Sequence, residues 1–143
     1  MTAHPDRTIA QSGGFDIIHP GHVRLVKAAQ HFGRVLIILN SDDWVRRNKG
    51  GLIMPWNDRR EVLLSLEGVH RVEPVEDGDG TVCEAIERLR PHIFGNGGLT
   101  SKRRTPERKL CHQLGIACVW GLGGGEFDQY SNQVLGALRK ETW

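Results

Sequence analysis

Apolar and amphipathic segments alternate along this chain, and each segment shows the period of one type of secondary structure. Residues 35–39 form a continuous apolar run, which is typical of a strand buried on both faces. Between residues 22 and 32 the apolar residues recur instead at the spacing of a helix. Because segments of the two kinds follow one another in turn, the pattern predicts βαβ units around a parallel sheet.

Glycines and turn residues separate these segments and predict their boundaries. Gly33 stands where a helix C-cap is expected. In the helix that follows Pro55, we expect Val62, Leu63 and Leu66 to share one face. The expected strands cover residues 7–12, 35–39, 69–75, 92–94 and 116–120. The expected helices cover residues 22–32, 42–47, 56–67, 81–90 and 131–138. A further helix is expected to be capped by Ser101 or Thr105 and to end at residue 114, with Gly115 closing it.

The length and the connections together predict one α/β domain. A chain of 143 residues can bury a core of its own, and we expect a single domain over residues 1–143. Right-handed βαβ connections produce a doubly wound sheet with helices on both faces. Ligands of such sheets bind at the carboxyl ends of the strands.

The net charge of +2 is too small to indicate a nucleic-acid partner and fits anionic metabolites. Cys83, Cys111 and Cys118 are odd in number and widely spaced, which predicts reduced thiols in a cytoplasmic protein. Their spacing does not predict a structural metal site. We expect neither a signal peptide nor a membrane association, because no apolar run approaches the length of a span.

The most informative stretch of the chain reads GGFDIIHPGH, from Gly13 to His22. It places a glycine turn between a strand and a helix that begins near Pro20. A helix N-terminus exposes unpaired backbone N–H groups and attracts anions. His19 and His22 add hydrogen-bond donors or positive charge at that point. The arrangement suits a polyphosphate.

This stretch resembles the G-x-F-D-x-x-H-x-G-H signature of the cytidylyltransferase-like nucleotidyltransferases. The resemblance implies a Rossmann-like fold and the transfer of a nucleoside monophosphate from a nucleoside triphosphate to a phosphorylated small molecule, with release of pyrophosphate. It further implies a homodimer, and it makes His19 and His22 catalytic. The chemistry implies Mg²⁺ as cofactor, since this ion neutralises the charge of a triphosphate. By the same match, the nucleotide-binding residues are Gly13, Gly14, Phe15, Asp16 and Gly21, with Asp16 also a candidate to support the metal.

The resemblance continues from Asn40 to Arg59. It implies that Lys49 reaches the phosphates and that the guanidinium fork of Arg59 clamps one of them. Arg60 is the neighbouring alternative, since helical spacing alone does not settle direction. Asn40 and Asp42 lie at the end of a strand and are candidate acceptor-binding residues, although helix caps are also needed there.

Two further glycine-rich segments match family positions. Residues Gly95–Gly98 resemble the loop near the nucleobase and ribose, which implies nucleotide contacts for Asn96, Gly97 and Gly98. Many members carry an acidic residue directly after these glycines, and this chain has Leu99. Ser131 matches a hydroxyl-rich helix start that contacts the triphosphate, although it could equally be an ordinary helix cap.

The substrates stay open at this stage. Resemblance to glycerol-3-phosphate cytidylyltransferase places CTP slightly ahead, and resemblance to heptose-1-phosphate adenylyltransferase domains implies ATP with a sugar phosphate as the alternative. A polyol phosphate or a phosphonate would also suit a basic cleft.

Two other functions were weighed from the sequence. Leu99, and the small number of hydroxyl residues around Ser131, raise the alternative of a catalytically weakened nucleotide-binding module. The basic cluster at residues 102–109 could bind RNA, but a solvated helix face is the preferred interpretation. Asp77 and Asp79 are assigned to a turn before a helix, not to calcium.

Overall fold

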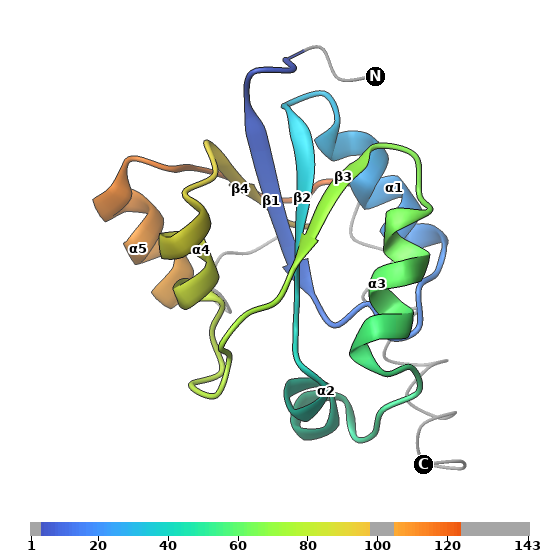
Figure 1. Cartoon of the computed structure of the whole chain (residues 1–143). Helices are drawn as coiled ribbons and strands as arrows, with labels where there is room; N and C mark the ends of the chain where they lie inside the picture. Colours follow the sequence, from blue (N-terminus) through green and yellow to red (C-terminus); the bar gives the residue numbers. More distant parts are fainter. Residues whose placement is uncertain (1–3, 98–104, 124–143) are drawn as a thin grey trace.

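The computed structural model describes residues 4–97 and 105–123, and Figure 1 shows one α/β domain in this part of the chain. Five strands form a single parallel sheet in the order β3-β2-β1-β4-β5. The elements are β1 (Thr8–Gly13), α1 (Pro20–Ala29), β2 (Arg34–Leu39), α2 (Asp42–Lys49), α3 (Trp56–Leu64), β3 (Val69–Glu73), α4 (Cys83–Leu89), β4 (Ile93–Gly95), α5 (Thr105–Leu114) and β5 (Ala117–Val119). The predicted Rossmann-like α/β class is confirmed.

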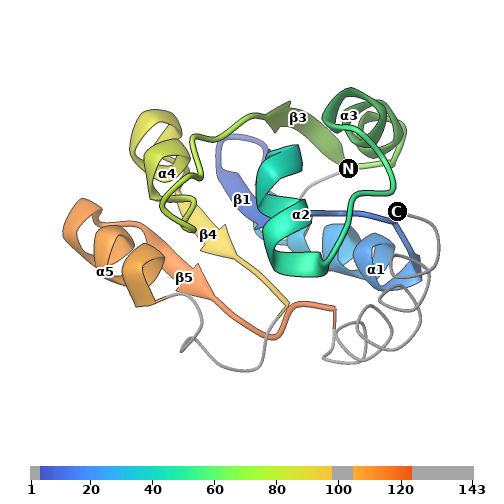
Figure 2. The same ribbon diagram turned by 90° about the horizontal axis from the view of Figure 1, so that it is seen from below.

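Helices cover both faces of the sheet, as the view in Figure 2 shows. Helices α1 and α3 pack on one face, while α4 and α5 pack on the other. Side chains of β2 alternate between these two layers: Val35 and Ile37 join the first core, and Leu36 and Ile38 join the second. The continuous apolar run at 35–39 is therefore explained by burial on both sides of the strand.

Among the described residues, no helix combines the length and the apolarity needed to cross a membrane.

Two predicted helices end earlier than their periodicity indicates. Helix α1 stops at Ala29, and its C-cap is Gln30, so the assignment of Gly33 as the cap is wrong. A Cβ at Gly33 would lie 2.7 Å from the carbonyl oxygen of Arg7, which accepts a hydrogen bond from the Arg34 N–H at 2.8 Å. Gly33 is thus required for close approach of two backbones where β2 begins.

Helix α3 ends at Leu64, and its buried residues are Arg59 and Leu63. These two are four positions apart and share a face. Val62 is 37% exposed, so the expectation that it shares one face with the buried Leu63 is wrong. Consecutive helical residues are about 100° apart, and the face that buries Leu63 together with Arg59 turns Val62 toward solvent.

We expect Gly33→Ala to lower the free energy of unfolding by about 2 kcal/mol, because the added methyl group collides with backbone that cannot move aside as a side chain can. Gly78→Ala is the matched control, since a Cβ there meets nothing within 4 Å and its φ is not in the left-handed region. Urea denaturation of both variants checks this. Equal stability of the two variants would contradict the close-approach explanation.

Candidate functional site

The loops that follow β1 and β2 meet the segment before α3 at the carboxyl ends of the central strands. Helix α2 lies just beyond that edge, directly after β2 (Figure 1). A Cβ at Gly14 would lie 3.3 Å from the Val45 side chain, so the loop after β1 packs closely against α2. This is the edge at which ligands of doubly wound sheets bind.

His19 and His22 form a capping box at the start of α1. The Nδ1 atom of His19 accepts a hydrogen bond from the Gly21 N–H at 3.1 Å, and the Nδ1 atom of His22 accepts one from the His19 N–H at 3.2 Å. The rings stack with centroids 3.9 Å apart. Two backbone donors that a helix start leaves unpaired are therefore satisfied by imidazole nitrogens.

These contacts determine the chemical form of both rings. A nitrogen that accepts a hydrogen bond carries no proton, so the proton of each neutral imidazole sits on Nε2. Burial lowers the pKa of His19. Burial first, and then the positive charges of His19 and Lys49, lower the pKa of His22 to about 3. The hydrogen bonds to Nδ1 and the lowered pKa values of both rings therefore favour the neutral form, with Nε2–H as the donor.

Phe15 supports this pair from the core. Its side chain is 3% exposed, and its ring centroid lies 4.7 Å from that of His22. A Cβ at Gly13 would come within 3.1 Å of the Phe15 ring, and Gly21 is buried beneath the cap. Phe15 therefore packs as a core residue, and any direct nucleotide contact of Phe15, Gly13 or Gly21 remains a prediction.

Asp16 ties the loop after β1 to the segment that precedes α3. It is 4% exposed, and its two carboxylate oxygens accept hydrogen bonds from the N–H groups of Ile53 at 2.7 Å and Met54 at 2.8 Å. Charge-assisted bonds to two consecutive amides hold this segment in place. The structure thus shows Asp16 as a positioning residue.

Arg59 is fully buried, and its guanidinium is surrounded by protein acceptors. It donates to the carbonyl oxygens of Met54 at 2.8 Å, Gly14 at 2.7 Å and Asn40 at 2.9 Å, and to a carboxylate oxygen of Asp42 at 2.6 Å. Four of its five N–H donors are occupied in this way. This geometry does not support the predicted role of Arg59 as a phosphate clamp, because its guanidinium joins three loops of the protein to one another.

Asn40 and Asp42 belong to the same network. Asn40 is 2% exposed and donates from Nδ2 to Asp77 at 3.0 Å, while Asp42 faces Arg59. Asp77 also accepts from the Ser41 N–H at 2.8 Å and from the Ser41 hydroxyl at 2.6 Å. Ser41 in turn accepts from the Trp44 N–H at 3.1 Å and caps α2. Acceptor binding by Asn40 and Asp42 remains a prediction.

Sequence reasoning missed the part that Asp77 plays here. It lies in the loop between β3 and α4, 36 positions beyond Ser41. The turn predicted for this acidic stretch is present, since the Gly80 N–H donates to the Asp77 carbonyl. No local signal in the stretch identifies a partner so distant along the chain.

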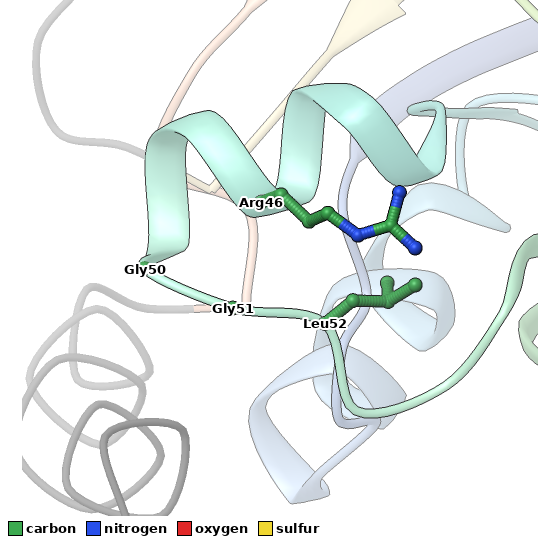
Figure 3. Close-up of a pocket in the computed structure, with 4 residues that line it drawn as sticks. All are labelled: Arg46, Gly50, Gly51 and Leu52. Atoms are coloured by element: carbon green, nitrogen blue, oxygen red, sulfur yellow. The ribbon is translucent and has the colours of Figure 1, made fainter. Parts of the chain in front are cut away.

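Lys49 is exposed on the last turn of α2, and its positive charge is one of the causes of the low pKa of His22. Beside it lies a hollow of about 450 Å³ lined by Arg46, Gly50, Gly51 and Leu52. Figure 3 shows the side chains of Arg46 and Leu52 extending in the same direction along it. The left-handed φ of 81° at Gly50 ends α2.

Asn96 and Gly97 directly follow β4, and both are buried. The Oδ1 atom of Asn96 accepts a hydrogen bond from the Ser12 N–H at 3.1 Å, which places the residue beside the end of β1. Gly98 and Ser131 lie outside the described residues.

Comparisons with known proteins show what this chain is similar to. A family model described as "Cytidylyltransferase-like" matches residues 11–119. The chain is similar to proteins named "Bifunctional protein HldE": it is 39% identical over 122 residues to the one from Streptomyces coelicolor and 37% identical over 125 residues to the one from Hahella chejuensis. These matches cover 83% and 85% of this chain but only 26% and 24% of the relatives, so the chain spans about a quarter of their length.

A solved structure shares the fold. The crystal structure of "the lipopolysaccharide core biosynthesis protein" from Thermoplasma volcanium superposes with a TM-score of 0.67 at 24% sequence identity. The match covers 80% of this chain and 94% of that chain.

The low pKa of His22 predicts that the free energy of unfolding decreases as the pH decreases. The folded value of about 3 lies below the ordinary 6.5, so between these values the unfolded chain binds a proton that the folded chain does not. We expect His22 to contribute a loss of ~1.4 kcal/mol per pH unit as the pH falls below 6.5. Urea denaturation from pH 7 to pH 4.5 measures it, with His22→Gln showing a shallower dependence because Gln keeps an acceptor for the cap but does not titrate. Parallel curves would refute the assignment.

Arg59→Met should lower the free energy of unfolding by about 3 kcal/mol or more, because the buried carbonyls of Gly14 and Asn40 and the Asp42 carboxylate lose their donor. Arg60→Met is the matched control on the same helix, where the side chain is exposed and the change should stay within about 0.5 kcal/mol. Chemical denaturation of the two variants tests the framework role of Arg59. Similar stabilities would rule it out.

Proposed function

This chain belongs to the cytidylyltransferase-like family of nucleotidyltransferases, and on that premise we propose that it transfers a nucleoside monophosphate from a nucleoside triphosphate to a phosphorylated small molecule. In this reaction an oxygen of the acceptor phosphate attacks the α-phosphorus. A new P–O bond forms, the bond to the β-phosphate oxygen breaks, and pyrophosphate leaves. No covalent intermediate with the enzyme is required.

The observation that carries the proposal is the histidine pair at the start of α1. Both rings are held by their Nδ1 atoms, so both have an Nε2–H at the opposite end. The negative charge that grows on the departing pyrophosphate would be stabilised by these donors and by the N-terminus of α1. Since the cap fixes the rings before substrate arrives, no reorganisation is needed during the reaction.

Lys49 supplies the positive charge that the neutral histidines lack. It stands at the end of α2, close enough to His22 for its charge to affect that ring. A flexible ammonium group suits a polyphosphate whose charge moves during the reaction. Arg59 and Asp16 act indirectly, because they hold the loops that carry these groups.

Magnesium enters this proposal with the substrate, as the complex that nucleoside triphosphates form through their phosphate oxygens. Within residues 4–97 and 105–123, no group of three or more His, Cys, Asp or Glu side chains could hold a metal ion. The Asp16 carboxylate, the candidate from the sequence, instead binds two backbone amides.

For the substrates, we propose ATP as the donor and a sugar phosphate as the acceptor. The sequence placed CTP slightly ahead, with the heptose-1-phosphate adenylyltransferase domains as the alternative. The similarity to bifunctional HldE proteins supports that alternative. The hollow beside Lys49 has room for a small phosphorylated acceptor.

His22→Ala should reduce turnover about a hundredfold, because one preorganised donor to the leaving group is lost. Pyrophosphate release is measured with Mg²⁺ and ATP or CTP, against glycerol 3-phosphate and a panel of sugar 1-phosphates. Lys27→Ala, an exposed change on the same helix, is the control and should leave turnover unchanged. Near-normal turnover in His22→Ala, with both variants folded, would refute the role of the histidine pair.

A further inference from the structure

Within the described part of the chain, Trp44 is the tryptophan that packs against neither core of the domain. Trp56 and Trp120 pack against the cores on the two faces of the sheet. Trp44 lies instead on the first turn of α2, where it is half-buried. Its N–H donates to the Ser41 hydroxyl at 3.1 Å, and its carbonyl accepts from the Asn48 amide at 2.9 Å. These backbone bonds fix its position but do not require an aromatic side chain.

The indole of Trp44 lies against the loop that leads from β1 to the histidine pair. A Cβ at Gly14 would come within 3.4 Å of Cζ3 and 4.0 Å of Cε3, so the six-membered ring contacts this loop. Both atoms lie on the side of the indole away from Nε1. Trp56 donates from Nε1 to the Leu39 carbonyl at 3.0 Å, whereas the same donor of Trp44 has no acceptor among the residues that the structure describes. An aromatic face and an N–H donor are therefore left over beside the candidate site.

Trp44 and Lys49 stand on either side of Val45 on helix α2. Val45 is fully buried, and its side chain lies 3.3 Å from the same Cβ position at Gly14. Since consecutive helical residues are about 100° apart, Trp44 is turned to one side of Val45 and Lys49, one turn later, is turned slightly to the other. Trp44 and Lys49 are separated by ~7.5 Å along the helix axis. A single small phosphorylated ligand can span the ring and the ammonium group.

The place of Trp44 in the sheet favours the acceptor over the nucleoside as its ligand. Helix α2 follows β2, and its cap Ser41 is held by Asp77 from the loop after β3. The sequence predicts that the nucleoside lies at the glycine-rich segment after β4, on the opposite side of β1. The side of β2 is then left for the acceptor, and the hollow beside Lys49 lies on the same helix. The C–H face of a sugar ring packs on an aromatic ring, and its hydroxyl oxygens accept hydrogen bonds.

We propose that Trp44 is a specificity-determining residue that supports the ring of a sugar phosphate acceptor on its indole and donates one hydrogen bond from Nε1 to a sugar oxygen. The assignment rests on the proposed function, because it requires a site that binds a nucleotide and a phosphorylated acceptor together. It adds a criterion for the acceptor. Lys49 recognises the phosphate, and Trp44 distinguishes a cyclic sugar from an open-chain polyol, which presents no continuous C–H face.

The test measures acceptor binding to the full chain by calorimetry. The nucleotide site is first filled with Mg²⁺ and the unreactive α,β-methylene analogue of ATP, or of CTP if the ATP analogue does not bind. The ring acceptors are heptose 1-phosphate, mannose 1-phosphate and glucose 1-phosphate, and glycerol 3-phosphate is the open-chain comparison. Trp44→Leu keeps an apolar contact with Gly14. It should raise the dissociation constant of the best ring acceptor about tenfold, equivalent to ~1.4 kcal/mol, and leave those of glycerol 3-phosphate and the nucleotide analogue unchanged. Asn57→Ala, an exposed change on α3, is the control and should alter none of them.

Trp44→Phe is the second variant, because it keeps an aromatic ring on the loop if the leucine variant fails to fold. It removes the N–H donor, so the dissociation constant of the ring acceptor should rise about threefold. Indole emission of the wild-type complex should also change when the ring acceptor is added, and this change should be absent from Trp44→Phe.

Four results would overturn the assignment of Trp44. They are unchanged affinity for the ring acceptor in both variants, a larger loss for the nucleotide analogue than for the ring acceptor, an emission change that persists in Trp44→Phe, and a wild-type protein that binds no ring acceptor more tightly than glycerol 3-phosphate. Absence of binding by ATP, CTP, GTP and UTP to the wild-type protein would instead overturn the proposed function itself.

Discussion

The site depends on one buried cation. The Arg59 guanidinium joins the loop after β1, the turn after β2 and the segment before α3 through the carbonyls of Gly14, Asn40 and Met54. A buried charge is tolerated only when its donors are satisfied, and Asp42 supplies the opposite charge. Three loops that lie far apart in the sequence are therefore held in one arrangement by a single side chain.

Asp16 and Asp77 complete this framework. Met54 is held at both ends, by Asp16 at its N–H and by Arg59 at its carbonyl. Asp77 holds the turn after β2, because its carboxylate accepts hydrogen bonds from the Asn40 side chain and the Ser41 N–H. Asp16 and Arg59 thus bind mostly protein backbone, and they hold the loop that leads from β1 to His19 and His22.

Features that depend on residues close together in the sequence could be predicted, and those that depend on distant residues could not. Residues 35–39 could be assigned to a strand, and a helix cap could be expected directly after them, because periodicity and capping are local. The histidine motif could be located, because it coincides with a helix start. The buried bonds of Arg59 and Asp77 could not be predicted, since their partners lie up to 45 positions away and nothing near them in the sequence differs from an exposed charge. Gly33 was misassigned for the same reason, because the carbonyl it must avoid belongs to Arg7, before β1.

The register of the sheet has a consequence for how the molecule assembles. Thr8 pairs with Arg34, 26 positions along the chain, whereas Ile9 pairs with Ile93, 84 positions along. Closing the longer loop costs roughly 1 kcal/mol more chain entropy, and the ladder from β1 to β4 has two residue pairs where the ladder from β1 to β2 has six. Contacts between residues near in sequence form readily, and those between distant residues form slowly. The sheet is accordingly expected to grow outward from β1 and β2, with the ladder between β1 and β4 forming after the ladder between β1 and β2.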